Sequence, residues 1–252
     1  MINIFFIFLY NKVNKCLKKK VTIIIPAFNE KNYINEIIGR VKNNINFEKQ
    51  IIVIDDCSSD GTREILKKIK YIDKIIFHKK NLGKGAAIKS AIPFIKGNIV
   101  AIQDADLEYN PIDLNKLINV LVSKDLNVVY GSRVLGRKKF RSLDQNINFS
   151  KNFRILGNYL LTKISNFLNN QSLTDVHTCY KIFRKKIFFE LNIKEKGFSF
   201  CPEVTTKLAK LSYKIIEVPI HYNGREIKDG KKIRFTDAIS ALKTIFKYKY
   251  FD

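Results

Sequence analysis

The 252-residue chain is 46% hydrophobic and carries 46 lysines and arginines against 23 aspartates and glutamates. These values predict a globular protein of one large domain or two small ones, and the excess of basic residues indicates an anionic partner, either a membrane surface or a phosphorylated ligand. The basic residues are spread along the chain without a zinc-finger, RRM or KH signature, so no nucleic acid is expected, and the four separated cysteines predict neither a zinc site nor a disulfide framework.

Residues 1–20 consist of a short apolar run followed by basic residues. The run is too short to cross a bilayer, and a signal peptide would carry its charge ahead of the apolar part. We therefore expect an N-terminal extension that is either an interfacial anchor or an unstructured segment. The expected location is cytoplasmic, with peripheral attachment to the cytoplasmic face of the membrane as the alternative to a freely dissolved protein.

From residue 21 onward, short apolar runs alternate with segments of helical periodicity. Continuous apolar strands with helices between them predict βαβ units in a mostly parallel sheet that helices cover on both faces. The predicted strands are 21–28, 50–57, 74–79, 98–106 and 126–133, and helices are predicted up to about 43, at 62–69, at 83–95 and from Pro111.

After residue 133 the alternation stops. Residues 134–150 are basic and polar, which predicts a mobile loop, and a second basic loop is predicted at 224–235. The run 213–223 predicts an edge strand, because Pro219 cannot donate to a neighbouring strand. Helices are predicted at 151–169, 174–191, 198–211 and 236–250, and no linker marks a second domain.

Four motifs follow predicted strands, at the point where each strand ends. They are 26-PAFNE-30, 55-DDCSSDGT-62, 104-DADLE-108 and 131-GSR-133. In open parallel sheets ligands bind at the carboxyl ends of the strands, so these carboxylates and one arginine are expected to share a crevice.

Asp104, Asp106 and Glu108 are spaced at every second residue. In an extended segment their side chains would project to the same side, where they would repel one another. A bound cation would hold them together. The alternative is a solvated acidic strand end.

The motifs occur together with NLGKGAA, TDxxTCYKxF and PEVTxKLAKLxYKIIEVPIHYxGR. In this order they resemble the family 2 glycosyltransferases, and within them the branch of dolichol-phosphate mannose synthase and bacterial polyprenyl-phosphate glycosyltransferases. The resemblance covers about residues 20–250. It implies the GT-A fold, an α/β, Rossmann-like, mostly parallel central sheet flanked by helices in a single domain. That domain would be 21–252, with 21–133 binding the nucleotide-sugar and 134–252 forming the acceptor half.

The resemblance also implies a nucleotide-sugar donor, a divalent cation and inversion at the anomeric carbon. The donor must lose its diphosphate, and Mg²⁺ or Mn²⁺ held by carboxylates neutralises the departing charge. Asp104 and Asp106 match the DxD pair of the family, with Asp104 also placed against the donor. Glu108 is expected to be a third ligand or a group beside the ligands.

For the nucleotide, the resemblance assigns the base and ribose to Pro26, Phe28, Glu30 and Asp56, although Asp56 has a turn or helix-capping role as its alternative. Cys57 stands where the family usually has glycine, so the turn is expected to differ slightly. Gly83 and Lys84 open a helix whose free N–H groups attract an anion, and the alternative is a simple helix start. The sequence does not distinguish uridine from guanosine as the nucleoside of the donor.

Arg133 is expected to bind the donor diphosphate or an acceptor phosphate. The resemblance places Arg225, Lys231 and Lys232 in a loop that closes over the diphosphate, with a solvated basic loop as the alternative.

Asp175 matches the family's aspartate near the acceptor, where it would be a general base or would orient the acceptor. Glu203 is the next acidic candidate.

Together these expectations describe an inverting glycosyltransferase that uses a UDP- or GDP-sugar. The expected acceptor is a polyprenyl phosphate, which needs no deprotonation. One alternative is a sugar hydroxyl in polysaccharide or glycolipid synthesis. Another, from a different class, is a sugar-1-phosphate nucleotidyltransferase. The closing helix predicts either core packing or attachment to an anionic membrane.

Overall fold

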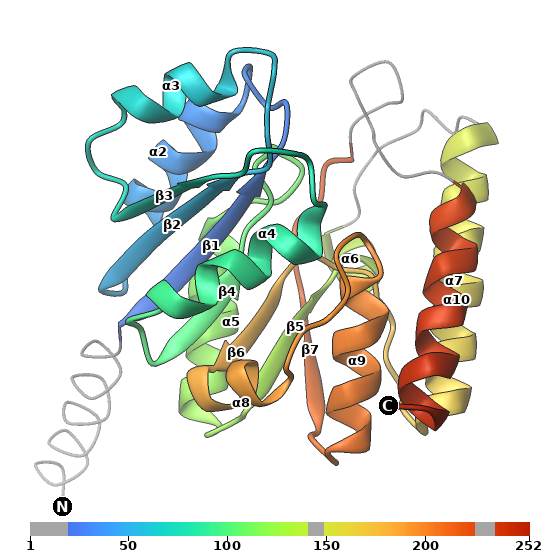
Figure 1. Cartoon of the computed structure of the whole chain (residues 1–252). Helices are drawn as coiled ribbons and strands as arrows, with labels where there is room; N and C mark the ends of the chain where they lie inside the picture. The colour runs from blue at the N-terminus through green and yellow to red at the C-terminus, as the bar shows by residue number, and fades with distance from the viewer. Residues whose placement is uncertain (1–19, 141–148, 225–234) are drawn as a thin grey trace, which may run out of the picture.

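The sheet of the computed structural model has seven strands in the order β3-β2-β1-β4-β6-β5-β7, with helices on both faces (Figure 1). The structure describes residues 20–140, 149–224 and 235–252. The strands are β1 (Val21–Ala27), β2 (Lys49–Asp55), β3 (Lys74–Phe77), β4 (Ile99–Ile102), β5 (Val128–Ser132), β6 (Lys181–Arg184) and β7 (Ile215–Pro219). The helices are α2 (Ile34–Asn44), α3 (Thr62–Lys68), α4 (Lys84–Ala91), η1 (Ile92–Phe94), α5 (Ile112–Ser123), α6 (Arg133–Phe140), α7 (Phe149–Asn169), α8 (Lys185–Glu190), α9 (Phe200–Lys210) and α10 (Phe235–Tyr250).

The centre of the sheet is apolar on both faces. Every residue of β4 is buried, and β1 is buried except for the half-buried Pro26. Isoleucine and valine dominate both strands, and their branched side chains pack well on a pleated surface. Because α4 packs on β1 and β2 while α5 packs on β5 and β6, both faces are shielded from water, as the continuous apolar runs predicted.

The strand directions place the predicted motifs at one end of the strands, the carboxyl end. β1 pairs in parallel with β2 and β4, and β2 pairs in parallel with β3. β7 is the outermost strand and runs parallel to β5, which confirms the edge strand predicted within 213–223, although the strand itself covers only Ile215–Pro219. β6 lies between β4 and β5 and is antiparallel to both, so β5 runs in the same direction as β4. The carboxyl ends of β1, β2, β4 and β5 therefore face the same side of the molecule.

The predicted helix 174–191 is wrong, because it contains β6 followed by the short helix α8. β6 runs antiparallel between β4 and β5, where Ile182 and Phe183 are fully buried. The Lys181 ammonium is buried as well and donates to the carbonyl oxygens of Val176 at 2.9 Å and Thr178 at 2.6 Å. A short apolar run does not by itself distinguish a strand from a helix. Here the segment is a strand because it pairs with β4 and β5, which are distant in sequence.

The predicted loop 134–150 is also wrong over its first part, where the chain forms α6. The N–H of Leu135 donates to Ser132 Oγ at 3.1 Å. A Cβ on Gly136 would lie 1.8 Å from the carbonyl oxygen of Ile220, so only glycine allows this close approach of the helix to the segment after β7. Residues 141–148 lie outside the described part of the chain, as does the predicted extension 1–20 apart from Lys20.

No helix among the residues that the structure describes is long and apolar enough to span a bilayer.

Candidate active site

The loops after β1 and β2 are joined to each other by hydrogen bonds. The N–H of Asn29 donates to Ser58 Oγ at 2.9 Å, and the N–H of Ser59 donates back to Asn29 Oδ1 at 2.9 Å. The N–H of Glu30 donates to Thr62 Oγ1 at 2.9 Å. The structure thus brings the first two motifs together as expected. Their contact with a base and ribose through Pro26, Phe28 and Glu30 stays a prediction.

Asp56 is buried behind this loop pair and is 3% exposed. Its Oδ1 lies 2.7 Å from His78 Nδ1 and accepts the N–H of Leu82 at 2.9 Å, while its Oδ2 accepts the N–H of Gly83 at 2.7 Å. Both oxygens therefore hold the turn that leads into α4. These contacts support the turn role that the sequence left open, and a contact with the nucleotide stays a prediction.

Cys57 has a φ of 67°, in the left-handed region that favours glycine. The chain therefore keeps at this turn a backbone path typical of glycine, despite its cysteine.

The glycines at the start of α4 serve close packing. A Cβ on Gly83 would lie 2.6 Å from the carbonyl oxygen of Lys196, and one on Gly85 would lie 2.2 Å from that of Glu195. The N–H of Ala86, in the first turn of α4, donates to the Lys196 carbonyl at 2.9 Å. The start of the helix is thus partly occupied by protein backbone, which favours the simple helix start over an anion site built from backbone alone.

Glu203 holds the segment that packs against these glycines. Its side chain is fully buried, accepts the N–H groups of Lys194 at 2.7 Å and Glu195 at 2.9 Å, and pairs with the Lys207 ammonium at 2.7 Å. The sequence offered Glu203 as a second acidic group near the acceptor. Its contacts instead define a structural role.

Lys84 reaches across to Asp104, and the two side chains form an ion pair. Burial disfavours the charged carboxylate, but the ammonium of Lys84 outweighs this and lowers the pKa of Asp104. The pair places Lys84 beside the acidic motif at the carboxyl end of β4.

The premise that 104–108 is extended is wrong. β4 ends at Ile102 and the chain bends over 105–108, so Asp106 Oδ1 accepts the N–H of Glu108 at 3.1 Å while Glu108 turns to Tyr222. The residues that the structure describes contain no cluster of three or more metal-ligating side chains. Asp104 and Asp106 still offer the hard oxygen ligands that fit Mg²⁺ or Mn²⁺, which commonly takes one or two carboxylates and completes its shell with water and substrate phosphates. The metal roles of Asp104, Asp106 and Glu108 stay predictions.

Arg133 and Asp175 form a two-pronged pair, in which Asp175 is fully buried and Arg133 is partly buried. Arg133 Nε donates to Asp175 Oδ2 and Nη2 donates to Oδ1, both at 2.7 Å, and the backbone N–H of Arg133 adds a contact of 3.1 Å. Asn158 of α7 donates to Oδ1 at 3.4 Å. Glu217 of β7 accepts the N–H groups of Thr174 and Asp175 at 2.7 and 2.9 Å, which fixes the backbone of this turn.

The surroundings of Asp175 favour its carboxylate form. Its side chain is fully buried, which opposes ionisation, but the guanidinium of Arg133 and its hydrogen bonds outweigh burial and hold the pKa of Asp175 below its usual range. A carboxylate with a lowered pKa is a weak base. Both oxygens of Asp175 contact Arg133, and the roles of Asp175 as a general base or as a group that orients the acceptor stay predictions.

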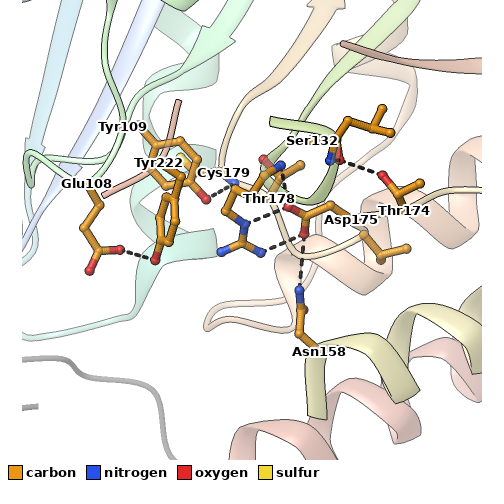
Figure 2. A network of polar contacts seen from close by, with 12 residues as sticks. Glu108, Tyr109, Ser132, Asn158, Thr174, Asp175, Thr178, Cys179 and Tyr222 are labelled. Carbon is orange, nitrogen blue, oxygen red and sulfur yellow. Dashed lines mark hydrogen bonds and ion pairs between the residues drawn. The ribbon is translucent and has the colours of Figure 1, made fainter. Parts of the chain in front are cut away.

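Two tyrosines connect this pair to the acidic motif. The Tyr222 hydroxyl donates to Glu108 Oε2 at 2.7 Å, and the Tyr222 ring lies 5.1 Å from the guanidinium carbon of Arg133 (Figure 2). Tyr109 accepts the N–H of Cys179 at 3.1 Å. The sequence interpretation missed these tyrosines, Asn158, Glu217 and His78. Glu217 and Tyr222 lie inside the quoted motif that ends at Arg225, and Tyr109 directly follows 104-DADLE-108, but the motifs gave none of them a role.

Arg225, Lys231 and Lys232 lie outside the described residues, so their predicted closure over the diphosphate stays a prediction.

A mostly parallel sheet with an acidic motif at the end of β4 is the architecture of the GT-A glycosyltransferases. Residues 22–191 match the family described as glycosyl transferase family 2, and the chain belongs to that family. The chain is similar to an uncharacterised protein of Methanocaldococcus jannaschii, with 27% identity over 94% of each chain. It is 28% identical to a dolichol-phosphate mannosyltransferase of Pyrococcus furiosus, over 91% of this chain and 61% of that protein.

The structure is similar in fold to glucosyl-3-phosphoglycerate synthase of Mycobacterium tuberculosis, which was solved with Mn²⁺, UDP and phosphoglyceric acid. The TM-score is 0.67 at 14% identity, over 93% of this chain and 80% of that one. The predicted family, fold class and enzyme class are thereby confirmed.

Proposed function

We propose that the protein moves a sugar, with inversion, from a UDP- or GDP-sugar to a polyprenyl phosphate. The observation that carries this proposal is the pair of Arg133 and Asp175, in which the guanidinium engages both oxygens of the fully buried carboxylate. The relative from Pyrococcus furiosus, a dolichol-phosphate mannosyltransferase, supports the same class of acceptor. The chain spans 61% of that relative's length, so its activity enters here only as support.

In the proposed reaction, an acceptor phosphate oxygen forms a bond to the anomeric carbon. The bond from that carbon to the donor diphosphate breaks, and the nucleoside diphosphate leaves with the electron pair. The acceptor oxygen is already anionic, so no residue has to remove a proton. Because Arg133 engages both oxygens of Asp175, this carboxylate fits such an acceptor better than a sugar hydroxyl, which needs a base.

Arg133 is the proposed ligand of the acceptor phosphate. A guanidinium has five N–H donors, and the Asp175 carboxylate engages Nε and Nη2. The pair fixes the plane of the guanidinium, which favours two-pronged contact with phosphate. Asp175 thus supports the acceptor through Arg133.

On the donor side, Asp104 and Asp106 are the proposed ligands of Mg²⁺ or Mn²⁺. When bound, the cation supplies positive charge against the departing diphosphate. Lys84 adds a second positive charge beside Asp104. Membership of family 2 argues against the sugar-1-phosphate nucleotidyltransferase that the sequence left open.

The donor assignment is tested by calorimetric titration of the whole chain with UDP and with GDP, each with Mn²⁺ and with chelator. We expect one nucleotide to bind with Mn²⁺ and to lose its binding with chelator, which identifies the base. Absence of binding for both nucleotides would contradict the donor site. Transfer to a polyprenyl phosphate but not to the matching polyprenol would support the acceptor, and the reverse preference would overturn it.

A membrane surface is the proposed place of the reaction. α7 and α10 lie side by side (Figure 1) and expose apolar side chains that we call the α7–α10 patch. It consists of Ile155, Leu156, Tyr159, Leu160, Ile164, Phe167, Ile239, Phe246 and Tyr250. Exposed apolar residues mixed with lysines, here Lys163 and Lys243, suit the boundary of an anionic bilayer. Asn158 connects the same helix α7 to Asp175, so the patch begins beside the proposed acceptor site.

Phe167→Glu is expected to weaken binding to vesicles containing phosphatidylglycerol roughly tenfold or more, because Phe167 is 86% exposed and contributes apolar area to the patch. Cosedimentation measures the effect. Phe189→Glu is the matched control, since Phe189 is 44% exposed on α8, outside the patch. Equal loss in both variants, or equal binding to neutral and anionic vesicles, would contradict the surface.

A further inference from the structure

Tyr222 contacts both halves of the candidate site. Its hydroxyl donates to Glu108 Oε2 at 2.7 Å, next to the acidic motif. Its ring lies 5.1 Å from the guanidinium carbon of Arg133, whose carboxylate partner is Asp175. One side chain therefore joins the proposed donor and acceptor sides.

The backbone around Tyr222 fixes this orientation. Tyr222 forms an isolated antiparallel bridge with Tyr109, and the N–H of Asn223 donates to the Glu108 carbonyl at 2.9 Å. On the other side, the N–H of His221 donates to Asp113 Oδ2 at 2.7 Å. The segment after β7 is thus attached both to the acidic motif and to the start of α5.

The ring of Tyr222 also has a defined packing partner. It meets Tyr109 edge-on, with the ring centroids 5.1 Å apart and the planes at 64°. Tyr109 is only 3% exposed and belongs to the core, whereas Tyr222 is partly exposed. Both rings thus pack in or against the core, but packing alone does not explain where the Tyr222 hydroxyl lies.

Glu108 explains the position of this hydroxyl. Its side chain is among the buried polar groups, at 9% exposure, where a carboxylate needs hydrogen-bond partners to stay in one orientation. The Tyr222 hydroxyl provides one such partner. A guanidinium over an aromatic ring is likewise attracted to the ring face, which restrains Arg133.

We propose that Tyr222 is a positioning residue that couples the two sides of the site. Its hydroxyl holds Glu108 beside Asp106, and its ring holds the guanidinium of Arg133 in the plane set by Asp175. The proposal rests on the proposed function, because it takes the acidic motif as the metal-binding side and Arg133 as the acceptor side. The hydroxyl contact with Glu108 is expected to affect metal binding, and the ring contact with Arg133 is expected to affect acceptor binding.

Tyr222→Phe removes the hydroxyl and keeps the ring. We expect about tenfold weaker Mn²⁺ binding in the presence of the nucleotide, since a group that orients a metal ligand typically changes affinity by about 10- to 100-fold. The KM for the acceptor is expected to stay unchanged. Tyr222→Leu removes the ring as well, and we expect it to add a rise in acceptor KM. Electron paramagnetic resonance measures free Mn²⁺ directly and requires no turnover.

Tyr213→Phe is the matched control. The Tyr213 hydroxyl also donates to a glutamate, Glu190 Oε2, at 2.8 Å, but on the protein surface and outside the site. This variant is expected to bind Mn²⁺ as the wild type does. In a Glu108→Ala background, which has no acceptor for the Tyr222 hydroxyl, Tyr222→Phe is expected to have little additional effect on Mn²⁺ binding.

Unchanged Mn²⁺ affinity in Tyr222→Phe, or an equal loss in Tyr213→Phe, would overturn the coupling while leaving the proposed function intact. A wild-type protein that binds no Mn²⁺ with either nucleotide would overturn the proposed function itself, and the coupling with it. The two failures are therefore distinguished by the wild-type titration alone.

Discussion

Asp106→Ala is expected to lower the affinity for the Mn²⁺–nucleotide complex by at least roughly 100-fold, because it removes a proposed direct ligand of the cation. The melting temperature is expected to change little, since the Asp106 side chain is partly exposed and lies in the bend after β4, outside the regular elements. Calorimetric titration with Mn²⁺ present measures the affinity, and thermal unfolding measures the stability.

Two further variants separate charge from local structure. Asp106→Asn keeps an acceptor for the Glu108 N–H but loses the negative charge, so it is expected to share the binding defect. Asp125→Asn is the control. The Asp125 side chain is 97% exposed and lies before the amino-terminal end of β5, whereas the candidate site lies at the carboxyl ends of the strands. Donor affinity that survives Asp106→Ala would show the metal assignment to be wrong.

The fold was predictable where local patterns agree with the tertiary structure. The apolar runs of β1, β2 and β4 are continuous because helices cover both faces of the sheet, and the sequence alone carries that signal. β6 broke the pattern. Its reversed direction depends on pairing with β4 and β5, which no local period encodes. The helix α6 was missed because its packing rests on Gly136 against Ile220, far apart in sequence.

The candidate site was predictable in its location and less so in the roles of its residues. Strand ends indicated where Asp56, Asp104 and Arg133 would gather. The role of Asp56 depends on His78 and on the N–H groups of Leu82 and Gly83, which the motif does not contain. The alternation of the acidic motif predicted an extended segment, but the chain bends after β4. A motif thus predicts at which end of the sheet a residue lies, whereas the hydrogen-bond partners of the residue determine its role.

Arg133→Met is expected to be the most destabilising of these changes. It leaves the fully buried Asp175 carboxylate without the partner that holds it at 2.7 Å, and removal of one member of a buried ion pair typically costs about 3–5 kcal/mol. For a chain of this size the melting temperature is expected to fall by roughly 6–20 °C. Thermal and denaturant unfolding measure the loss, and transfer to the acceptor is expected to cease.

The loss is expected to depend on pH in a defined direction. The folded-state pKa of Asp175 is held below the ordinary value of 3.8, so its ionised form contributes stability at pH values above that value. This contribution is lost as the pH falls below 3.8 through the lower pKa of the folded protein. The difference in unfolding free energy between the wild type and Arg133→Met is therefore expected to be full near neutral pH and to shrink in acid.

The double variant Arg133→Met with Asp175→Leu distinguishes stability from function. Apolar replacement of both members of a buried ion pair is often neutral or stabilising, so the double variant is expected to regain most of the lost stability. It has no guanidinium for an acceptor phosphate, and transfer is expected to remain absent although Mn²⁺–nucleotide binding persists. A stable double variant that still transfers sugar would contradict the role of Arg133. In that case the pair would be a structural feature alone, and the acceptor phosphate would need another cationic ligand.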